Sequence, residues 1–314
     1  MAFERFEVLS IEDALAKYTS SLFRPSVAAR LMTLLDSFSE TAKTAVVERD
    51  YIDIDYSASY HDQRGRSFTP TLHGTTRIHF FTEQFTKRAI VGAGNRTVRK
   101  MIFSYLGFTV VRPDRPTTLG RTFLSCPPNV SGKPAGFPPR GTILVDLAGI
   151  PLTIESCPYM SQDRKIMACA TTALWMSSTP LVDKIPGVAS HSTSEITGMA
   201  MSLNRPYGPA IGRRGLTLPE MEQAFLEIGF DPRVYTYPTP AQLVEICHLF
   251  SDSGIPLVLY IESNGIGHAV TVIGYTLKAP DAPEASIPGI FRAHQFVADL
   301  IIHDDEGECI CSPK

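Results

Sequence analysis

The sequence predicts an α+β fold, and this prediction rests on three observations. Residues 11–24 and 26–40 place apolar side chains at the three- and four-residue spacing of amphipathic helices. Residues 45–60 instead alternate between apolar and polar side chains, which is typical of a half-buried strand. Residues 254–275 contain two β-rich runs on either side of the glycine turn SNGIG, which indicates a β-hairpin. Helices and antiparallel strands are therefore expected together.

The alternation within residues 45–60 also predicts which side chains are buried. Ile52, Ile54 and Tyr56 share one face of the expected strand, and Asp53 and Asp55 share the other. Because apolar side chains usually face the core, we expect the first face inside and the two acids in solvent.

A basic cluster follows in a region where a strand is expected to lead into short helices. It consists of Lys87, Arg88, Arg96, Arg99 and Lys100. Charge runs of this kind usually form the solvated face of a helix, and that is the interpretation favoured by the sequence.

The chain of 314 residues is long enough for two domains of ordinary size. Residues 113–140 are rich in Pro and Gly, so the domain boundary is expected between about 125 and 150. We therefore predict an N-terminal α+β domain over 1–125, whose role the sequence does not indicate. A linker with a leading strand would follow over 126–150, and a second domain over 151–314.

Two further helices are predicted in the second domain, over 216–229 and 240–253. The apolar residues expected on the inward face of the latter are Leu243, Val244, Ile246, Leu249 and Phe250.

Composition narrows the classes of function. Hydrophobic residues make up 44% of the chain, charged residues 19%, and the formal net charge of −3 gives no support for a nucleic-acid or membrane partner. The first residues do not form a secretory signal, and no run approaches the roughly 18 apolar residues that a membrane helix requires. The six cysteines are scattered and do not resemble a disulfide framework. A cytoplasmic, reducing location is therefore expected.

Cys169 occupies a position that suits a nucleophile. It stands where the polar run QDRK gives way to small and apolar helix formers that continue to Pro180. At the first turn of a helix, unpaired N–H groups and the positive end of the macrodipole favour a thiolate. Taken alone, however, such a cysteine is more often an ordinary buried residue.

A histidine and two acids later in the chain strengthen the catalytic interpretation. His268 opens the strand HAVTVIGY directly after a glycine turn, and Asp304 and Asp305 end the strand-like segment FVADLIIHDDEG. Thiol, imidazole and carboxylate are the three groups that cysteine-based acyl transfer requires: a nucleophile, a base, and an acid that orients the base.

The region from about 150 to 311 resembles the papain-like cysteine peptidase superfamily. It is most similar to the bacterial branch that includes the bacteriocin-leader-processing peptidases and their stand-alone relatives. The matching positions are Cys169, His268 in GHAVTVIGY, Asp304 in IIHDDEG and Gln162 in the SQD stretch. The stretch LTLPEMEQAFLEIGF resembles the middle helix of that branch, and GIPLVLYI the strand before the histidine.

The resemblance implies a helix carrying the cysteine, packed on an antiparallel sheet that carries the histidine and the aspartate. It further implies that Cys169 is the nucleophile, His268 the base, Asp304 the orienting acid and Gln162 an oxyanion donor. Asp305 remains an alternative to Asp304. No metal or organic cofactor is expected.

Three functions are compatible with these residues. The first is a cysteine peptidase that cleaves an amide bond through a thioester. The second is a papain-like deamidase, transglutaminase or acyltransferase acting on protein side chains, and the third is a non-catalytic binding module of the same fold. The joint presence of cysteine, histidine and acid favours the peptidase. Its expected partners are a protein or peptide substrate and a regulatory protein acting through residues 1–125.

Overall fold

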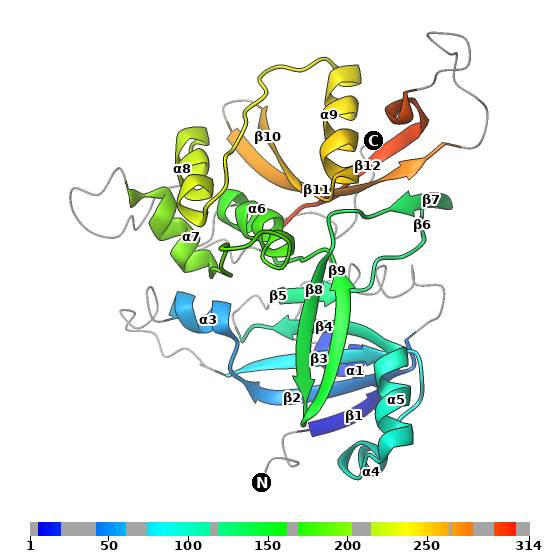
Figure 1. The fold of residues 1–314 in the computed structure, drawn as a ribbon. Coiled ribbons are helices and arrows are strands. Elements are labelled where there is room, and N and C mark those ends of the chain that lie inside the picture. Colours follow the sequence, from blue (N-terminus) through cyan, green and yellow to red (C-terminus); the bar gives the residue numbers. More distant parts are fainter. Residues whose placement is uncertain are drawn as a thin grey trace. The chain divides into compact units, whose positions relative to one another are not determined.

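The chain is described by a computed structural model that combines helices with antiparallel sheets, and it confirms the α+β class (Figure 1). The residues that the structure describes are 6–19, 42–60, 74–113, 119–161, 169–202, 215–263, 266–278 and 292–305. Within them, no helix is both long and apolar enough to cross a membrane.

The chain forms two compact units, and it passes between them more than once. The first unit comprises Met1–Cys126, Thr142–Ile166 and Ser192–Ser194. The second comprises Pro127–Gly141, Met167–His191 and Glu195–Lys314. The stretch 126–150, predicted as a linker, is thus shared between the two units.

The first unit is built on a five-stranded antiparallel sheet whose strands neighbour one another in chain order. The strands are β1 (Phe6–Ser10), β2 (Thr44–Tyr51), β3 (Thr75–Phe81), β4 (Tyr105–Val111) and β5 (Leu119–Leu124). All seven residues of β4 are buried, which explains its nearly continuous apolar sequence. Its two hydroxyls have partners: that of Thr109 lies 2.6 Å from the Thr122 hydroxyl on β5, and that of Tyr105 lies 2.9 Å from His79 Nδ1 on β3.

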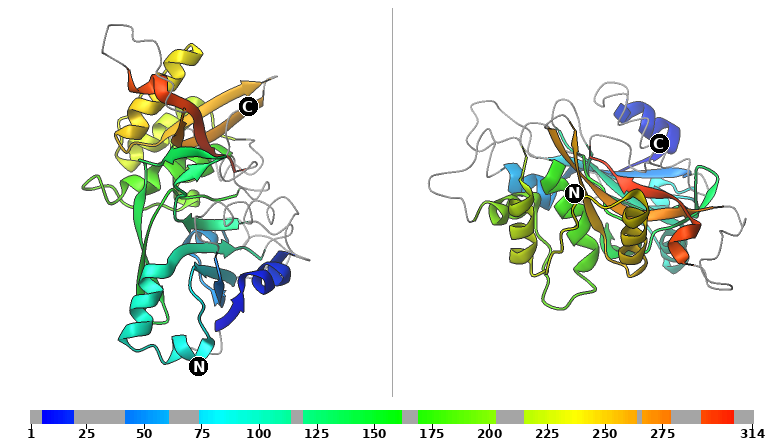
Figure 2. Two further views of the ribbon diagram at one scale, coloured as in Figure 1. Left: turned by 90° about the vertical axis from the view of Figure 1, so that its right-hand side faces the viewer. Right: turned by 90° about the horizontal axis from the view of Figure 1, so that it is seen from above.

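A two-stranded ribbon, drawn in green in Figure 1 and in the left view of Figure 2, belongs to the same unit. It consists of β8 (Gly141–Leu147) and β9 (Ile150–Ser156). Buried and exposed residues alternate along the whole of β9, so that Ile150, Leu152 and Ile154 face the core. Isolated bridges from Ser125 to Ser156 and from Thr122 to Tyr159 join this segment to β5. This pairing explains why residues 142–166 belong to the first unit.

The helices of the first unit are short. They are α1 (Ile11–Thr19), α3 (Ile54–Ser59), α4 (Lys87–Val91) and α5 (Asn95–Ser104). The helix predicted over 26–40 lies outside the described residues.

The prediction of one strand over residues 45–60 is wrong beyond Tyr51. The side chain of Asp53 accepts a hydrogen bond from the Tyr56 backbone N–H at 2.9 Å and thereby starts α3. Asp53 and Asp55 are buried, whereas Ile52 and Ile54 are 69% and 66% exposed, the reverse of the expectation.

A half-buried guanidinium explains this reversal. The Arg121 Nε atom lies 2.7 Å from Asp53 Oδ2 and 3.4 Å from Asp55 Oδ2. Carboxylates can be buried when they are paired with a cation. Alternation shows only that two faces differ in polarity, and it does not show which face packs inward.

The sheet of the second unit is arranged around one long strand. β11 (Ile266–Leu277) pairs antiparallel with β10 (Leu257–Ser263), β12 (Val297–His303) and β7 (Lys133–Gly136), and β7 in turn pairs with β6 (Asn129–Val130). The hairpin predicted over 254–275 and the strand predicted before Asp304 are thereby confirmed. The pairing of β7 with β11 explains why residues 127–141 belong to the second unit.

Among the residues that the structure describes, four helices accompany this sheet, although the first two residues of α7 belong to the first unit. They are α6 (Cys169–Ser178), α7 (Thr193–Ala200), α8 (Leu218–Ile228) and α9 (Pro240–Asp252), with short 3-10 turns at Thr179–Leu181 and Ala293–Phe296. Both α8 and α9 were predicted, and each begins with a capping box and a proline in its first turn.

The inward face of α9 differs from the prediction at one position. Leu243 and Val244 pack on a cluster of Cys247, Val272 and Leu300, as their spacing predicts. Leu249, however, is 62% exposed, and the buried residue of that turn is Cys247.

Candidate active site

Cys169 is the first residue of α6, and the rest of the helix holds it in place. Every residue from Ala170 to Ser178 is buried. The Thr271 hydroxyl on β11 donates to the Ala173 carbonyl oxygen at 3.1 Å, which fixes α6 on the sheet. Cys169 itself is half-buried. Its thiol therefore stands at the end of a rigid helix, where the first N–H groups have no partner within the helix.

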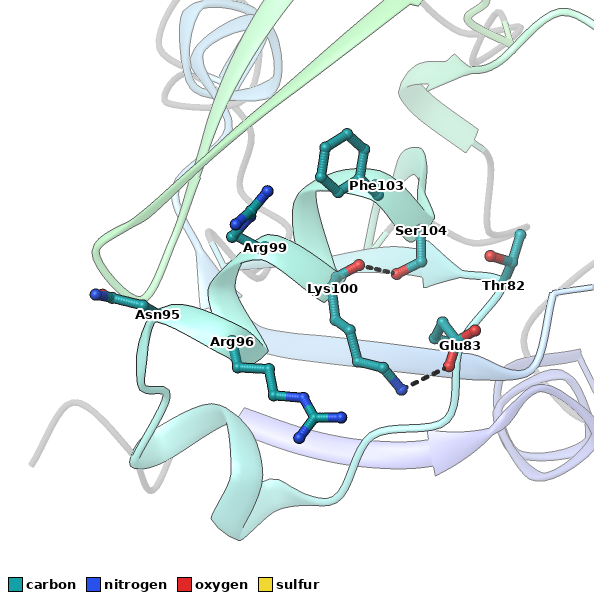
Figure 3. A pocket seen from close by; sticks show the side chains of 8 residues that line it. All are labelled: Thr82, Glu83, Asn95, Arg96, Arg99, Lys100, Phe103 and Ser104. Carbon is teal, nitrogen blue, oxygen red and sulfur yellow. Dashed lines mark hydrogen bonds and ion pairs between the residues drawn. The ribbon is translucent and has the colours of Figure 1, made fainter.

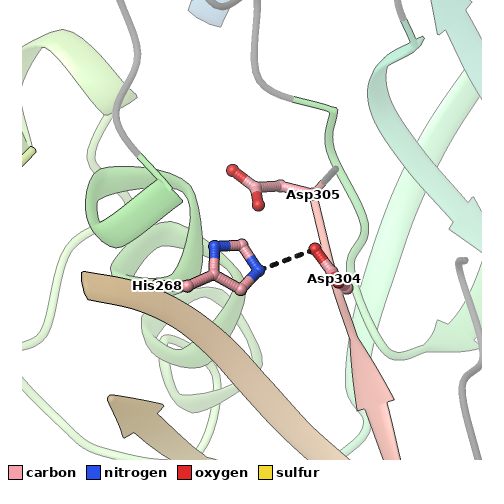
Figure 4. A group of neighbouring side chains, drawn as sticks. All are labelled: His268, Asp304 and Asp305. Carbon is pink, nitrogen blue, oxygen red and sulfur yellow. Dashed lines mark hydrogen bonds and ion pairs between the residues drawn. The ribbon is translucent and has the colours of Figure 1, made fainter. Parts of the chain in front are cut away.

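The pairing of β11 with β12 brings His268 and Asp304 together. In the antiparallel register Thr271 lies opposite His303, so the end of β12 runs toward the start of β11. The residue after β12, Asp304, consequently reaches the imidazole, and its Oδ1 atom lies 3.0 Å from His268 Nε2 (Figure 4). The side chains of His268 and Asp304 are 30% and 22% exposed, so the pair is accessible to a ligand.

Hydrogen bonds to the imidazole favour its protonated form. The bond with Asp304, followed by a bond with the Cys169 thiol, raises the pKa of His268 from 6.5 to about 10, although partial burial opposes the shift. At neutral pH both ring nitrogens therefore carry protons, and Nε2–H donates to Asp304. The other nitrogen, Nδ1, points away from that carboxylate and is the one left for the sulfur (Figure 4). The structure thus joins His268 to Asp304 through a hydrogen bond, and the Cys169 thiol is near enough to contribute to the raised pKa of the imidazole.

Asp305 lies beside these groups and is buried, with 3% of its surface exposed. One ligand atom from each of His268, Asp304 and Asp305 lies within 4.8 Å of the others, so the three could together hold a divalent cation. A nitrogen that donates to a carboxylate cannot also coordinate a metal. A cation bound through Nε2 would therefore have to compete with the bond to Asp304, and that bond is the one expected of an orienting carboxylate.

Gln162, the predicted oxyanion donor, lies outside the described residues. Its role stays a prediction.

One residue beside the imidazole was not singled out from the sequence. Ile261 on β10 pairs directly with His268 on β11 and is 49% exposed. Directly opposed residues share a face of the sheet, with Cβ atoms about 4.5–5.5 Å apart. Ile261 therefore presents an apolar surface next to the candidate base. Counting outward from the SNGIG turn would have found this pair, whereas the apolar run IPLVLYI indicated only a buried strand.

Comparisons of the chain with protein-family models, with curated proteins and with solved structures found no match. The chemistry of the site is therefore inferred from its own side chains. They form a half-exposed array of thiol, imidazole and carboxylate at the meeting point of one helix and two strands.

Proposed function

We propose that this protein is a cysteine peptidase-type hydrolase and that its second unit is papain-like. The observation that carries the proposal is the position of His268, whose Nε2 atom is hydrogen-bonded to Asp304 and whose pKa is raised by that bond and by the Cys169 thiol. The packing of α6 on a sheet whose strands end at His268 and Asp304 supports the papain-like arrangement.

In the first half of the reaction, Cys169 acts as the thiolate of a thiolate–imidazolium pair. Its sulfur attacks the carbonyl carbon of an amide or isopeptide bond, and a tetrahedral intermediate forms. The backbone N–H of Cys169, at the start of α6, stabilises the oxyanion together with the predicted donor Gln162. Losing one such donor typically slows catalysis by about 10²–10³-fold.

The intermediate then collapses to a thioester. The carbon–nitrogen bond breaks, and the leaving amine takes the proton from His268. In the second half, neutral His268 removes a proton from water, the hydroxide displaces the sulfur, and the acid product leaves as the thiolate–imidazolium pair returns. Throughout, Asp304 keeps the imidazole oriented with the same nitrogen toward the sulfur.

The direct test is the pH dependence of iodoacetamide alkylation at Cys169, followed by peptide mass spectrometry in the full chain. We expect Cys169 to react rapidly near pH 6 and to lose this reactivity in His268→Ala. His191→Ala, at a histidine outside the site, should behave as the wild type. The other five cysteines serve as internal references. If Cys169 reacts as an ordinary thiol in all three proteins, the pair does not form and the proposal fails.

A second assay separates the peptidase from a deamidase or transferase with the same three groups. Unfolded casein is incubated with the wild type and with Cys169→Ala, and new N-termini and free ammonia are measured. New N-termini that depend on Cys169 support the peptidase. Ammonia release without new N-termini would indicate a deamidase, and acyl transfer to an added amine would indicate a transferase. Either result would contradict the assignment as a peptidase.

A further inference from the structure

The first unit carries an open cavity of about 660 Å³ between the end of β3 and helix α5. Its lining includes Asn95, Arg96, Arg99, Lys100 and Phe103 from α5, and Glu83 from the segment after β3 (Figure 3). This volume lies within the range of about 300–1,000 Å³ that is usual for ligand sites.

The cavity carries an excess of positive charge. Lys100 is paired with Glu83 at 3.0 Å, whereas the guanidinium groups of Arg96 and Arg99 make no ion pair or hydrogen bond among the described residues (Figure 3). No acid occupies the first turn of α5, and no side chain caps it. Because the whole chain has a net charge of −3, this is a local concentration of positive charge and not a general property of the surface.

An exposed aromatic ring accompanies the two guanidiniums. Phe103 is 82% exposed. Arg96, Arg99 and Phe103 stand at positions i, i+3 and i+7 of α5, so they follow one another along a single helix face. A single exposed apolar side chain is ordinary in a folded protein, but Phe103 lies in the lining of the same cavity as the two guanidinium groups, so one ligand could contact all three.

We propose that this face of α5 binds an acidic peptide segment of another protein. Carboxylates of the segment pair with Arg96 and Arg99, and an apolar side chain next to them covers Phe103, one turn further along the helix. Arginine suits this role because its planar group binds a carboxylate through two parallel hydrogen bonds. The site lies in the first unit and does not depend on the chemistry of Cys169.

The number of unpaired cations favours a peptide over a nucleic acid. Nucleic-acid binding proteins commonly contact about 6–10 phosphates, whereas this face offers two unpaired guanidiniums and one ring. A small inorganic anion would satisfy the charges and leave Phe103 exposed. A peptide with acidic and apolar side chains in alternation pairs with the guanidinium groups and also covers Phe103.

The test uses the full chain with Cys169→Ala, so that a bound peptide is not consumed. Fluorescence anisotropy measures the binding of a labelled Glu- and Asp-rich peptide with a central Leu. We expect saturable binding that weakens with added salt. The double variant Arg96→Ala with Arg99→Ala should weaken binding about tenfold, because it removes two exposed ion pairs whose effects on the dissociation constant multiply. Phe103→Ala should weaken binding about fivefold.

The matched control removes the same number of charges from the neighbouring helix, as Lys87→Ala with Arg88→Ala on α4. This variant should bind within about twofold of the parent. Circular dichroism verifies that each variant is folded, as expected for exposed side chains. Three results would overturn the proposal. They are equal weakening of peptide binding by both double variants, the absence of saturable binding, and tighter binding of a single-stranded oligonucleotide than of the peptide.

Discussion

The Nε2 atom of His268 lies 3.0 Å from the Oδ1 atom of Asp304, a residue 36 positions later in the chain. This single contact fixes the orientation of the imidazole, because a ring held through one nitrogen presents the other in a defined direction. It also shows that Asp304, and not its neighbour Asp305, makes the hydrogen bond to this nitrogen, a choice that the sequence left open.

The first prediction concerns that distinction. Asp304→Asn should slow the alkylation of Cys169 at pH 6 by about tenfold or more, because a neutral amide no longer stabilises the imidazolium and each pKa unit lost by His268 corresponds to a factor of ten. Asp305→Asn is the matched control and should have a much smaller effect. Rates are measured by mass spectrometry across pH 5–9. A larger loss in the Asp305 variant would assign the orienting role to Asp305.

The second prediction is a pH dependence of stability. Hydrogen bonds to Asp304 and Cys169 raise the pKa of His268 to about 10 in the folded state. Between about pH 6.5 and pH 10 the folded protein therefore holds a proton that the unfolded chain has released, so the free energy of unfolding falls as pH rises. This contribution is fully present below pH 6.5 and is lost as pH rises through 10.

Trp175 makes the measurement specific to the second unit. It is the chain's only tryptophan and is buried in α6. Urea unfolding followed by its fluorescence at pH 6, 8 and 10 should give a steeper loss of stability in Cys169→Ala than in the double variant Cys169→Ala with His268→Ala. Both proteins lack the Cys169 thiol, whose own protonation is coupled to that of His268, so the other titrating groups are common to the two and cancel in the difference. Parallel curves would show that the imidazole is not held as described.

The parts of the fold predicted from the sequence depend on local signals. Helices α8 and α9 start at capping boxes formed by residues three apart, Thr217 with Glu220 and Thr239 with Gln242. The β10–β11 hairpin follows from apolar runs around a short glycine turn. The candidate site could be predicted because its cysteine and histidine each stand at the start of such an element.

The parts that were missed depend on contacts between distant segments. The burial of Asp53 and Asp55 requires Arg121, which lies more than sixty residues later. The pairing of Gly136 with Tyr275 likewise joins residues from opposite ends of the second unit's sequence. Neither partner is visible in the local pattern, because non-local pairing is decided by the packed core and not by propensity.

The third prediction tests the buried acid pair. Arg121→Met should destabilise the protein by roughly 3–5 kcal/mol, because it leaves two buried carboxylates without their cation. Burial, with a contribution from Asp53, raises the pKa of Asp55 to about 7 while Arg121 opposes the shift. The acid is therefore neutral at pH 5 and charged at pH 8, so the destabilisation should be larger at pH 8.

Calorimetry at the two pH values measures this difference. Arg88→Met, at an exposed arginine of α4, is the control and should change stability by less than about 0.5 kcal/mol at both. If Arg121→Met lowers the free energy of unfolding by the same amount at pH 5 and at pH 8, Asp55 does not titrate in this range.

The fourth prediction tests the close approach of β7 and β11, which brings a distant segment onto the strand that carries His268. A Cβ atom on Gly274 would lie 2.1 Å from the Gly136 carbonyl oxygen, so any larger side chain must separate the two backbones. Gly274→Ala should therefore lower the free energy of unfolding by about 1–3 kcal/mol, measured by urea unfolding with Trp175 fluorescence. At Gly136, in the same unit, a Cβ would make only an ordinary contact, 3.5 Å from the Tyr275 ring, and Gly136→Ala should change stability little. If Gly274→Ala unfolds at the wild-type urea concentration, β7 does not pair with β11 in solution, and residues 127–141 would have to be placed elsewhere.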